Sequence, residues 1–282
     1  TALSYPFIGI YNGGAAVFRA MGNSKVSMLC SALMNLINIG GNAVLIYGLG
    51  AGVEGAAIAT LLSRMAAALV ILWLLCKGGG RVQLHQPLKP EYHREMVRGI
   101  LRVGVPGGLE NGMFQIGKVL VQGLVASFGT AVIAANAMAN NIAMIPHVSG
   151  SAIGLAMVTV VGQCVGAGEY EQARKYMLGL TGLVYASMGT LEVFLGLSAG
   201  FWVGLFQLPP ETAAIAVQLI HSFVIFAIIF WPASFALPNG LRAAGDVRFT
   251  MLVSTASMWV FRIGASFLLC SPLVGMGIMG VW

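Results

Sequence analysis

Charged residues are scarce in this chain of 282 amino acids: they make up 9% of it, whereas hydrophobic residues make up 58%. A soluble globular domain has about 25% charged residues, so this composition excludes a protein whose whole surface faces water. Segments 26–49, 119–166 and 212–237 contain no Asp, Glu, Lys or Arg, and about 20 apolar residues are enough to span a bilayer. The composition therefore predicts an all-α polytopic membrane protein.

Cysteines and catalytic motifs are also few. The four cysteines stand singly, without a CxxC pair or the spacing of a metal site, and are interpreted as small buried hydrophobes. The chain has no HExxH motif and no Walker loop. Its GxSxG match at 196–200 lies inside an apolar run rather than at a strand-to-helix elbow. We therefore expect no enzyme, no organic cofactor and no resident metal; an intramembrane enzyme is the alternative from a different class.

The basic residues are confined to a few turns. Twelve of the fifteen lie in four clusters: Arg19 and Lys25; Lys77, Arg81, Lys89, Arg94, Arg98 and Arg102; Arg174 and Lys175; Arg242 and Arg248. Turns without Lys or Arg alternate with them, at 47–52, 127–130, 206–212 and 271–276. Such alternation follows the positive-inside rule and predicts a multi-pass protein of the cell membrane with its basic loops in the cytoplasm. A nucleic-acid partner is not expected, because no polar face combines basic and aromatic residues.

The same alternation divides the chain into spans. They are expected near 26–47, 52–76, 98–126, 131–165, 172–205, 212–241 and 248–270, with partial spans before Arg19 and from about 277, so that eight to nine are present. Segment 77–97 is polar, with Gly and Pro punctuation. The predicted domains are therefore the end of an N-terminal lobe (1–76), a cytoplasmic linker (77–97) and a C-terminal lobe (98–282).

The chain also contains an internal repeat. FRAMGNSKVSML (18–29) returns as LRAAGDVRFTML (241–252), so that Arg19 aligns with Arg242, 223 residues later. A GxGxxG pattern at 50–55 recurs at 275–280, which argues for duplication and against a nucleotide site. Both copies of the arginine turn lie on the basic side. The repeat therefore predicts two six-helix bundles related by a pseudo-two-fold axis along the membrane normal, about twelve spans in all, of which this chain is a fragment.

Several segments resemble a known family. GVPGGLENGMFQIGK (104–118), FGTAVIAANAMANNI (128–142), IGLAMVTVVGQCVGAGEYEQARKY (153–176) and LRAAGD (241–246) resemble the second half of multidrug and toxic compound extrusion (MATE) transporters. FRAMGNSK (18–25) and GVEGAAIAT (52–60) resemble the first half. The resemblance implies a monomer with a V-shaped cavity between its bundles, which exports small amphipathic, often cationic, compounds in exchange for H⁺ or Na⁺. A lipid-linked sugar flippase of the same superfamily is the closest rival.

One departure from the family concerns the coupling ion. In sodium-coupled members, the helix that begins GVP typically carries a carboxylate two turns after its proline, and another lies in the helix that ends LRAAG. These places correspond to Phe114 and Trp231 here. Trp231 is instead a candidate aromatic wall for amphipathic cations, with simple packing as the alternative.

The segment after Pro106 carries the main coupling candidate. Glu110 is an ionisable residue within a span, which is costly and therefore points to function; a structural pair with a basic residue is the alternative. Asn111, Gln115 and Lys118 follow on one helical face and are expected to face a wet cavity or a partner helix. Lys118 could be the counter-charge of another carboxylate or extend to the membrane surface.

A second polar stripe lies on the next span. Asn136 and Asn140 are cavity-lining candidates, with bridging between helices as the alternative. His147, further along, could relay protons or simply pack. Glu192 is a further buried candidate, and a structural pair of Glu192 with Arg262 is predicted from their similar depths.

Overall fold

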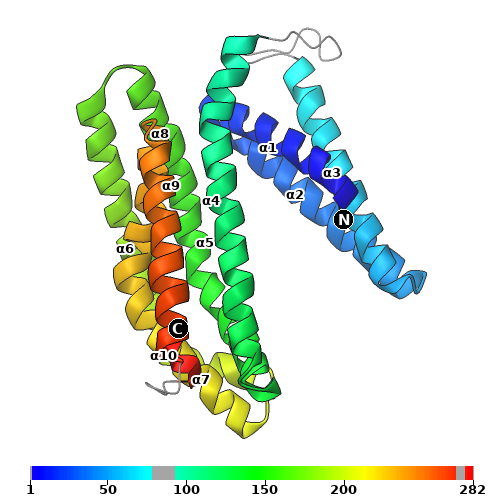
Figure 1. The fold of residues 1–282 in the computed structure, drawn as a ribbon. Coiled ribbons are helices and arrows are strands. Elements are labelled where there is room, and N and C mark those ends of the chain that lie inside the picture. Colours follow the sequence, from blue (N-terminus) through cyan, green and yellow to red (C-terminus); the bar gives the residue numbers. More distant parts are fainter. Residues whose placement is uncertain (1, 78–92, 271–276, 282) are drawn as a thin grey trace. The chain divides into compact units, whose positions relative to one another are not determined.

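The computed structural model describes residues 2–77, 93–270 and 277–281, and these form only helices and turns. Figure 1 shows the long helices. The all-α prediction is confirmed. The chain divides into two compact units, Thr1–Tyr92 and His93–Trp282, and the boundary falls within the predicted linker 77–97. The first helix of the second unit begins at Arg94, four residues before the expected start of the span 98–126.

Six helices among the described residues are long and apolar enough to cross a membrane. They are Ser24–Gly48, Gly52–Lys77, Thr130–Gly166, Tyr170–Gly204, Pro210–Ala243 and Val247–Leu269. Large apolar side chains cover the helix flanks; Leu197 is 86% exposed and Phe261 71% exposed. Such flanks suit contact with lipid rather than water. The chain is therefore a multi-pass membrane protein.

The first unit consists of three long helices. They are α1 (Tyr5–Ala20), α2 (Ser24–Asn42), which continues as a π-helical segment Ala43–Gly48, and α3 (Gly52–Lys77); a short 3-10 turn, Ala2–Ser4, precedes them. Residues from all three helices form its core: Tyr11, Ala15, Phe18, Cys30, Ala67, Ile71 and Leu75. Gly14 allows α1 to lie close to α3, because a Cβ there would be 2.8 Å from Cγ1 of Ile71.

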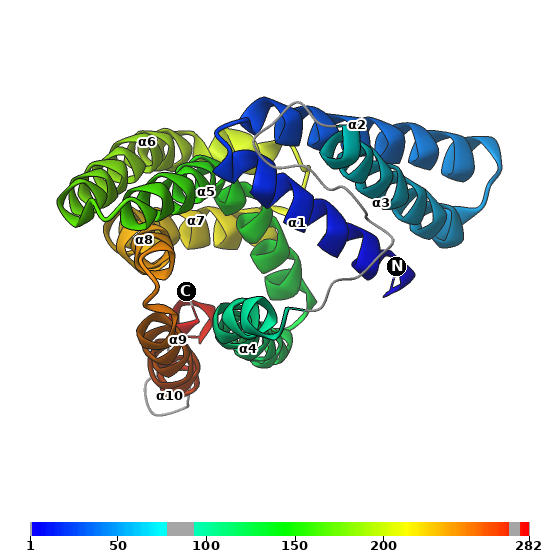
Figure 2. The same cartoon turned by 90° about the horizontal axis from the view of Figure 1, so that it is seen from above.

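The second unit contains the remaining helices. They are α4 (Arg94–Ala126), α5 (Thr130–Gly166), α6 (Tyr170–Gly204), α7 (Pro210–Trp231), α8 (Leu237–Ala243), α9 (Val247–Ala256) and α10 (Ala265–Leu269). Two π-helical segments, Pro232–Ala236 and Ser257–Gly264, join α7 to α8 and α9 to α10. A 3-10 turn covers Gly277–Gly280. Within this unit α5, α6, α7 and α8 pack together, and α4 packs mainly on α9 (Figure 2).

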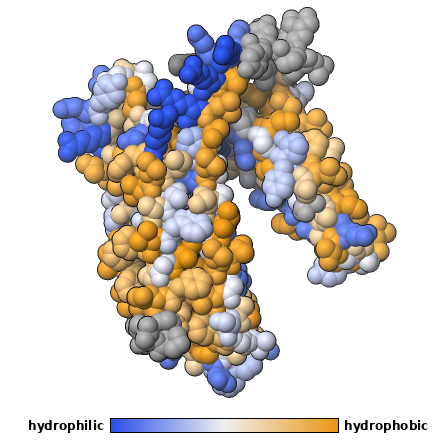
Figure 3. All heavy atoms as spheres, in the orientation of Figure 1, coloured by the Kyte–Doolittle hydropathy of each residue, from blue (hydrophilic) through white to orange (hydrophobic). Residues whose placement is uncertain are grey.

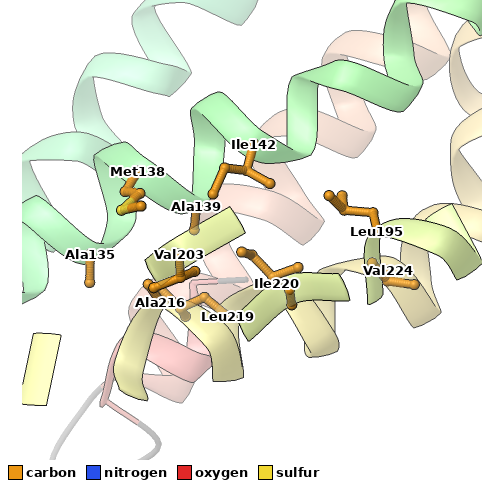
Figure 4. Packing of buried hydrophobic residues seen from close by; sticks show 11 residues of the cluster. Ala135, Met138, Ala139, Ile142, Leu195, Val203, Ala216, Leu219, Ile220 and Val224 are labelled. Atoms are coloured by element: carbon orange, nitrogen blue, oxygen red, sulfur yellow. The ribbon is translucent and has the colours of Figure 1, made fainter. Parts of the chain in front are cut away.

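Small and branched side chains form the main core of the second unit. Figure 4 shows how α5, α6 and α7 meet there through side chains such as Ala139, Leu195 and Ile220. Alanines on facing helices let the backbones approach closely, which is how helices associate in membranes where lipid is as apolar as the protein. This core holds α5, α6 and α7 side by side and so fixes the residues described below.

The repeated arginine turns have the same backbone structure. Gly22 follows α1 with φ +79°, and Gly245 follows α8 with φ +97°. In the first turn, Gly22 donates to Arg19 O and the next amide donates to Phe18 O; in the second, Gly245 donates to Arg242 O and the next amide to Leu241 O. Both are helix ends closed by a glycine in the left-handed conformation. The sequence repeat therefore corresponds to a structural one at these two turns.

Basic turns of the second unit lie at one end of it. The start of α4, the α5–α6 turn and the α8–α9 turn meet at that end in Figure 1, and the turns at 127–129 and 205–209 lie at the other. Hydrophilic surface gathers at the basic end, whereas the sides are largely hydrophobic (Figure 3). This is the arrangement on which the positive-inside prediction depends.

The helices differ from expectation at two of the predicted spans. Helix α4 continues through Pro106 without interruption. With 33 residues α4 is long enough to cross a membrane. It is more polar than the six helices named above and is not one of them. Of the span predicted from about 277, the structure describes only the turn Gly277–Gly280, and residues 271–276 lie outside the described part.

Candidate functional site

Glu110, the predicted coupling carboxylate, forms an ion pair with Arg242. Its Oε1 accepts a hydrogen bond from Nη2 of Arg242 at 2.5 Å, and Nη1 of the same guanidinium donates to Oδ1 of Asn239 at 3.2 Å. The Glu110 side chain is 11% exposed. The pair joins α4 to α8 near the repeated turn, as the structural alternative expects. A coupling role for Glu110 stays a prediction.

The polar stripe of α4 is exposed within the second unit. Asn111, Gln115 and Lys118 all have exposed side chains, as their helical spacing predicts. Nδ2 of Asn111 donates to the carbonyl of Gly107 in its own helix at 2.9 Å. A cavity-lining role for the stripe stays a prediction, since it concerns a space bounded by more than this unit.

Two cations flank the ring of Phe114. Nζ of Lys118 lies 5.2 Å from the ring centroid, and Cζ of Arg262 lies 5.8 Å from it. Both distances are within the range of cation–π attraction. Arg262 is thus next to Phe114 and not next to Glu192, so the predicted pair of Glu192 with Arg262 is wrong. Two residues at the same depth in the membrane meet only if the rotation of each helix about its own axis turns them toward each other. The sequence indicates the depth but not this rotation.

The asparagines of α5 bind to neighbouring groups. Asn136 is 4% exposed, and its Nδ2 donates to Oε1 of Gln122 on α4 at 3.4 Å. Nδ2 of Asn140 donates to the backbone carbonyl of Asn136 at 2.8 Å. Asn136 therefore bridges two helices, as the alternative interpretation expects. Asn140 is exposed, and a cavity-lining role for it stays a prediction.

His147 faces a buried carboxylate. Nε2 of His147 on α5 lies 3.9 Å from Oε1 of Glu192 on α6, and the Glu192 side chain is fully buried. Among the described residues, Nε2 of His147 and both oxygens of Glu192 have no hydrogen-bond partner. Buried ionisable groups without partners are costly and are found where they have a function.

A continuous row of five rings passes through this part of the second unit. Phe114 meets Phe235 edge to face at 6.0 Å, Phe235 stacks on Trp231 at 5.2 Å, Trp231 stacks on His147 at 4.8 Å, and His147 meets Phe223 at 5.5 Å between ring centroids. We call these five residues the aromatic row. It connects α4, α5, α7 and the π-helical segment Pro232–Ala236, and one of its members, Phe235, is 43% exposed.

The aromatic row depends on a glycine and lies at a π-helical segment. A Cβ on Gly150 would lie 2.5 Å from Cζ3 of Trp231 and 2.8 Å from Sδ of Met188. The indole therefore fits against α5 only because position 150 has no side chain. Trp231 is the last residue of α7 before the π-helical segment Pro232–Ala236, and π-segments in helices frequently mark functional sites.

The described residues also line two small cavities in the second unit. One, of about 220 Å³, lies at the basic end and is lined by Arg102, Val103, Gly245, Asp246, Val247 and Arg248. The other, of about 310 Å³, is lined by Asn141, Ile142, Ile145, Trp202, Leu205 and Phe206. Sites for drug-sized ligands have volumes of about 300–1,000 Å³; the first cavity is smaller than this range, and the second lies at its lower end.

Sequence reasoning missed the partnership of His147 with Glu192. One signal was present, since Glu192 is the single charged residue of the apolar stretch 176–206. Its partner could not be read in the same way, because it depends on the rotation of α5 against α6.

Known proteins resemble the chain over nearly its whole length. The sequence profile of the MatE family matches residues 106–268, more than half of the chain. The uncharacterized transporter YisQ of Bacillus subtilis (strain 168) is 28% identical over 95% of this chain and 59% of its own length. The probable multidrug resistance protein NorM of Thermotoga maritima is 25% identical over 95% of this chain and 58% of its own length. The chain thus spans about three fifths of these relatives.

Solved structures share the fold. A multidrug resistance MATE family transporter of the MOP superfamily, in an outward-facing conformation, superposes with a TM-score of 0.87 over 96% of this chain and 60% of its own, at 24% identity. A MOP superfamily transporter from Pyrococcus furiosus gives a TM-score of 0.86 over 96% of this chain and 61% of its own, at 24% identity. With the profile match over more than half of its residues, the chain belongs to the MatE family of membrane transporters.

Proposed function

We propose that the full-length protein exports amphipathic organic cations in exchange for H⁺ or Na⁺ by alternating access. Membership of a transporter family supports transport as the activity, and relatives such as NorM of Thermotoga maritima bear the description of probable multidrug resistance proteins. The substrate is a small molecule taken from the cytoplasm or the bilayer. The basic end of the second unit faces the cytoplasm in this proposal.

The aromatic row is the observation that carries the proposal. Ring faces attract organic cations and bury their apolar parts, and the row offers several such faces in succession. Its exposed member, Phe235, gives a ligand access, and Trp231 and Phe114 lie behind it. Rigid aromatic surfaces without fixed donors suit compounds that share charge and hydrophobicity but not shape.

The π-helical segment between α7 and α8 supports alternating access. The π-helical segment Pro232–Ala236 holds Phe235 and begins directly after Trp231. Proline lacks the amide that would continue the helical hydrogen bonds, so this segment can change its bending without breaking bonds elsewhere. Conformational switching needs such an element with two arrangements.

The carboxylates present in the second unit bear on which ion is coupled to export. The family resemblance expects Na⁺-binding carboxylates at positions 114 and 231. These positions hold Phe114 and Trp231, which are both members of the aromatic row. Hard metal cations prefer oxygen ligands, which these rings do not provide. The buried acids of the second unit are Glu110, paired with Arg242, and Glu192, beside His147. This distribution favours H⁺ over Na⁺.

One observation favours a second candidate, an amphipathic anion or a lipid-linked sugar. Lys118 and Arg262 both lie over Phe114, so one end of the aromatic row carries two positive charges. An anionic headgroup could bind there while its apolar part lies along the rings. This candidate is closer to the flippase alternative than to multidrug export.

Transport in sealed vesicles tests the proposal. The full-length protein would be given a proton gradient or a sodium gradient separately, and efflux of ethidium would be followed against that of a fluorescent anion of similar size. Ethidium movement driven by either gradient is the expected result. Movement of the anion alone would favour the second candidate, and movement of neither would contradict both.

A further inference from the structure

Glu192 lies in an apolar part of the second unit. Its side chain is 0% exposed. On the same face of α6, Met188 and Leu195, one turn to either side, are also buried. Neither carboxylate oxygen has a hydrogen-bond partner among the described residues. An ionised carboxylate in this position would have neither water nor a donor to stabilise it.

In the part of the chain that the structure describes, one titratable group forms a close contact with this carboxylate. His147, from α5, places Nε2 3.9 Å from Oε1. The titratable residues of α7 are Glu211, in its first turn, and His221, whose Nε2 lies 3.0 Å from the carbonyl oxygen of Gly196. On α6 itself, Tyr185 donates its hydroxyl to the carbonyl of Ile229 at 3.1 Å.

The other elements packed on α6 add no competing charge. The π-helical segment Pro232–Ala236 contains no titratable residue. On α8, Arg242 is engaged by Glu110 at 2.5 Å. Within the described residues, the charge state of Glu192 therefore depends chiefly on His147.

The burial of the two groups decides how many protons they hold. A carboxylic acid beside a neutral imidazole carries one proton, and a carboxylate beside an imidazolium also carries one; both pairs have no net charge. Removing that proton leaves an uncompensated carboxylate inside the bundle, and adding a second leaves an uncompensated imidazolium. The pair is therefore stable with one proton while Glu192 is shielded from water, as it is in this structure, and it releases the proton when water reaches the site.

The proton is next to the surface proposed to bind the substrate. The imidazole of His147 stacks on the indole of Trp231 with ring centroids 4.8 Å apart, and both belong to the aromatic row. A cation on the row repels a proton on His147 and favours the pair that has lost it. By linkage, loading of the proton weakens cation binding by the same factor. This is the relationship that an antiporter requires.

We infer that Glu192 and His147 form a one-proton binding site whose proton competes with an organic cation on the aromatic row. The identity of the competitor rests on the proposed function, whereas the proton site rests only on the geometry of the pair. No covalent step is involved: a proton from one aqueous phase adds to the pair and leaves to water when the cation binds.

Infrared difference spectra of the full-length protein in lipid vesicles test the proton site directly. The carbonyl stretch of a protonated carboxyl group would be compared at low and high pH for the unmodified protein and for Glu192→Gln, His147→Gln and His221→Gln. We expect Glu192→Gln to remove a titrating band, His147→Gln to shift it, and the control His221→Gln to leave it unchanged. Gel filtration verifies folding.

Identical bands in Glu192→Gln and the unmodified protein would overturn the proton site. If that variant does not fold, an unshifted band in His147→Gln overturns the pairing. Tetraphenylphosphonium is then added. We expect its binding to remove the Glu192 band in the unmodified protein, and we expect this loss of intensity to be at least severalfold smaller in His147→Gln. Binding of tetraphenylphosphonium without loss of the band would overturn the competition between proton and cation. Absence of binding would overturn the proposed export function, and the proton site would then be tested by the pH dependence of the band alone.

Discussion

Arg242 and Glu110 join two helices that are far apart in the sequence: Nη2 of the guanidinium lies 2.5 Å from Oε1 of the carboxylate and connects α8 to α4. Arg242 belongs to the second copy of the repeated turn. In the first copy, Arg19 instead donates from Nη1 to Oγ of Ser27 at 3.0 Å. The two turns therefore keep one backbone but differ in what their arginines bind, which is how a duplicated element acquires a separate role.

We expect Glu110→Gln and Arg242→Gln each to lower the free energy of unfolding by about 1.5–3 kcal/mol, the range for a hydrogen bond to a charged group. The double variant should cost clearly less than the sum, because the second substitution removes a group that has already lost its partner. Thermal unfolding of the full-length protein in detergent measures this. Additive effects would show that the two side chains do not stabilise each other.

The repeated turns predict matched effects of Gly22→Ala and Gly245→Ala. Both glycines have positive φ, and an alanine in the left-handed conformation costs about 1–2 kcal/mol. Each variant should therefore lose a similar amount of thermal stability. Gly179→Ala, within α6 and with open space around its Cβ position, is the control and should be neutral or stabilising. A neutral Gly245→Ala would contradict the equivalence of the turns.

Gly150→Ala should weaken binding of an organic cation about tenfold, which corresponds to about 1.4 kcal/mol. The new methyl group would collide with the indole of Trp231 and with Met188, so the aromatic row would shift. Gly162→Ala on the same helix meets nothing within 4 Å and should bind normally. Titration with tetraphenylphosphonium compares the two. Equal affinities would mean that the position of Trp231 does not matter for binding.

Topology is tested by cysteine labelling in intact cells. Ala244→Cys lies in the exposed α8–α9 turn at the basic end, and Ser127→Cys lies in the exposed turn before α5 at the opposite end. With the native cysteines replaced by serine, a membrane-impermeant maleimide added outside should label position 127 and not position 244. The reverse pattern would overturn the cytoplasmic placement of the basic turns.

Much of the fold could be predicted from the sequence because membrane spans depend on local composition. The apolar runs and the glycine turns each lie within a few neighbouring residues, and a repeat such as Arg19 and Arg242 needs only alignment. The continuous course of α4 through Pro106 was less accessible, since it depends on how neighbouring helices support a missing hydrogen bond.

The candidate site could be predicted only in part. Its residue types were visible: His147, Trp231 and Glu192 are unusual in apolar runs. Their partners were not, because side chains meet according to the rotation of each helix as well as its depth. Arg262 and Glu192 have similar depths, yet Arg262 lies over Phe114 and Glu192 lies beside His147.

Binding of the exported cation to the aromatic row is tested most directly by the dissociation constant of tetraphenylphosphonium for Trp231 variants of the full-length protein. A cation–π contact contributes about 1–2 kcal/mol when partly desolvated. We therefore expect Trp231→Leu to bind roughly tenfold more weakly, Trp231→Phe to retain most affinity, and Trp202→Phe, outside the row, to bind normally. Unchanged binding by Trp231→Leu would contradict the account.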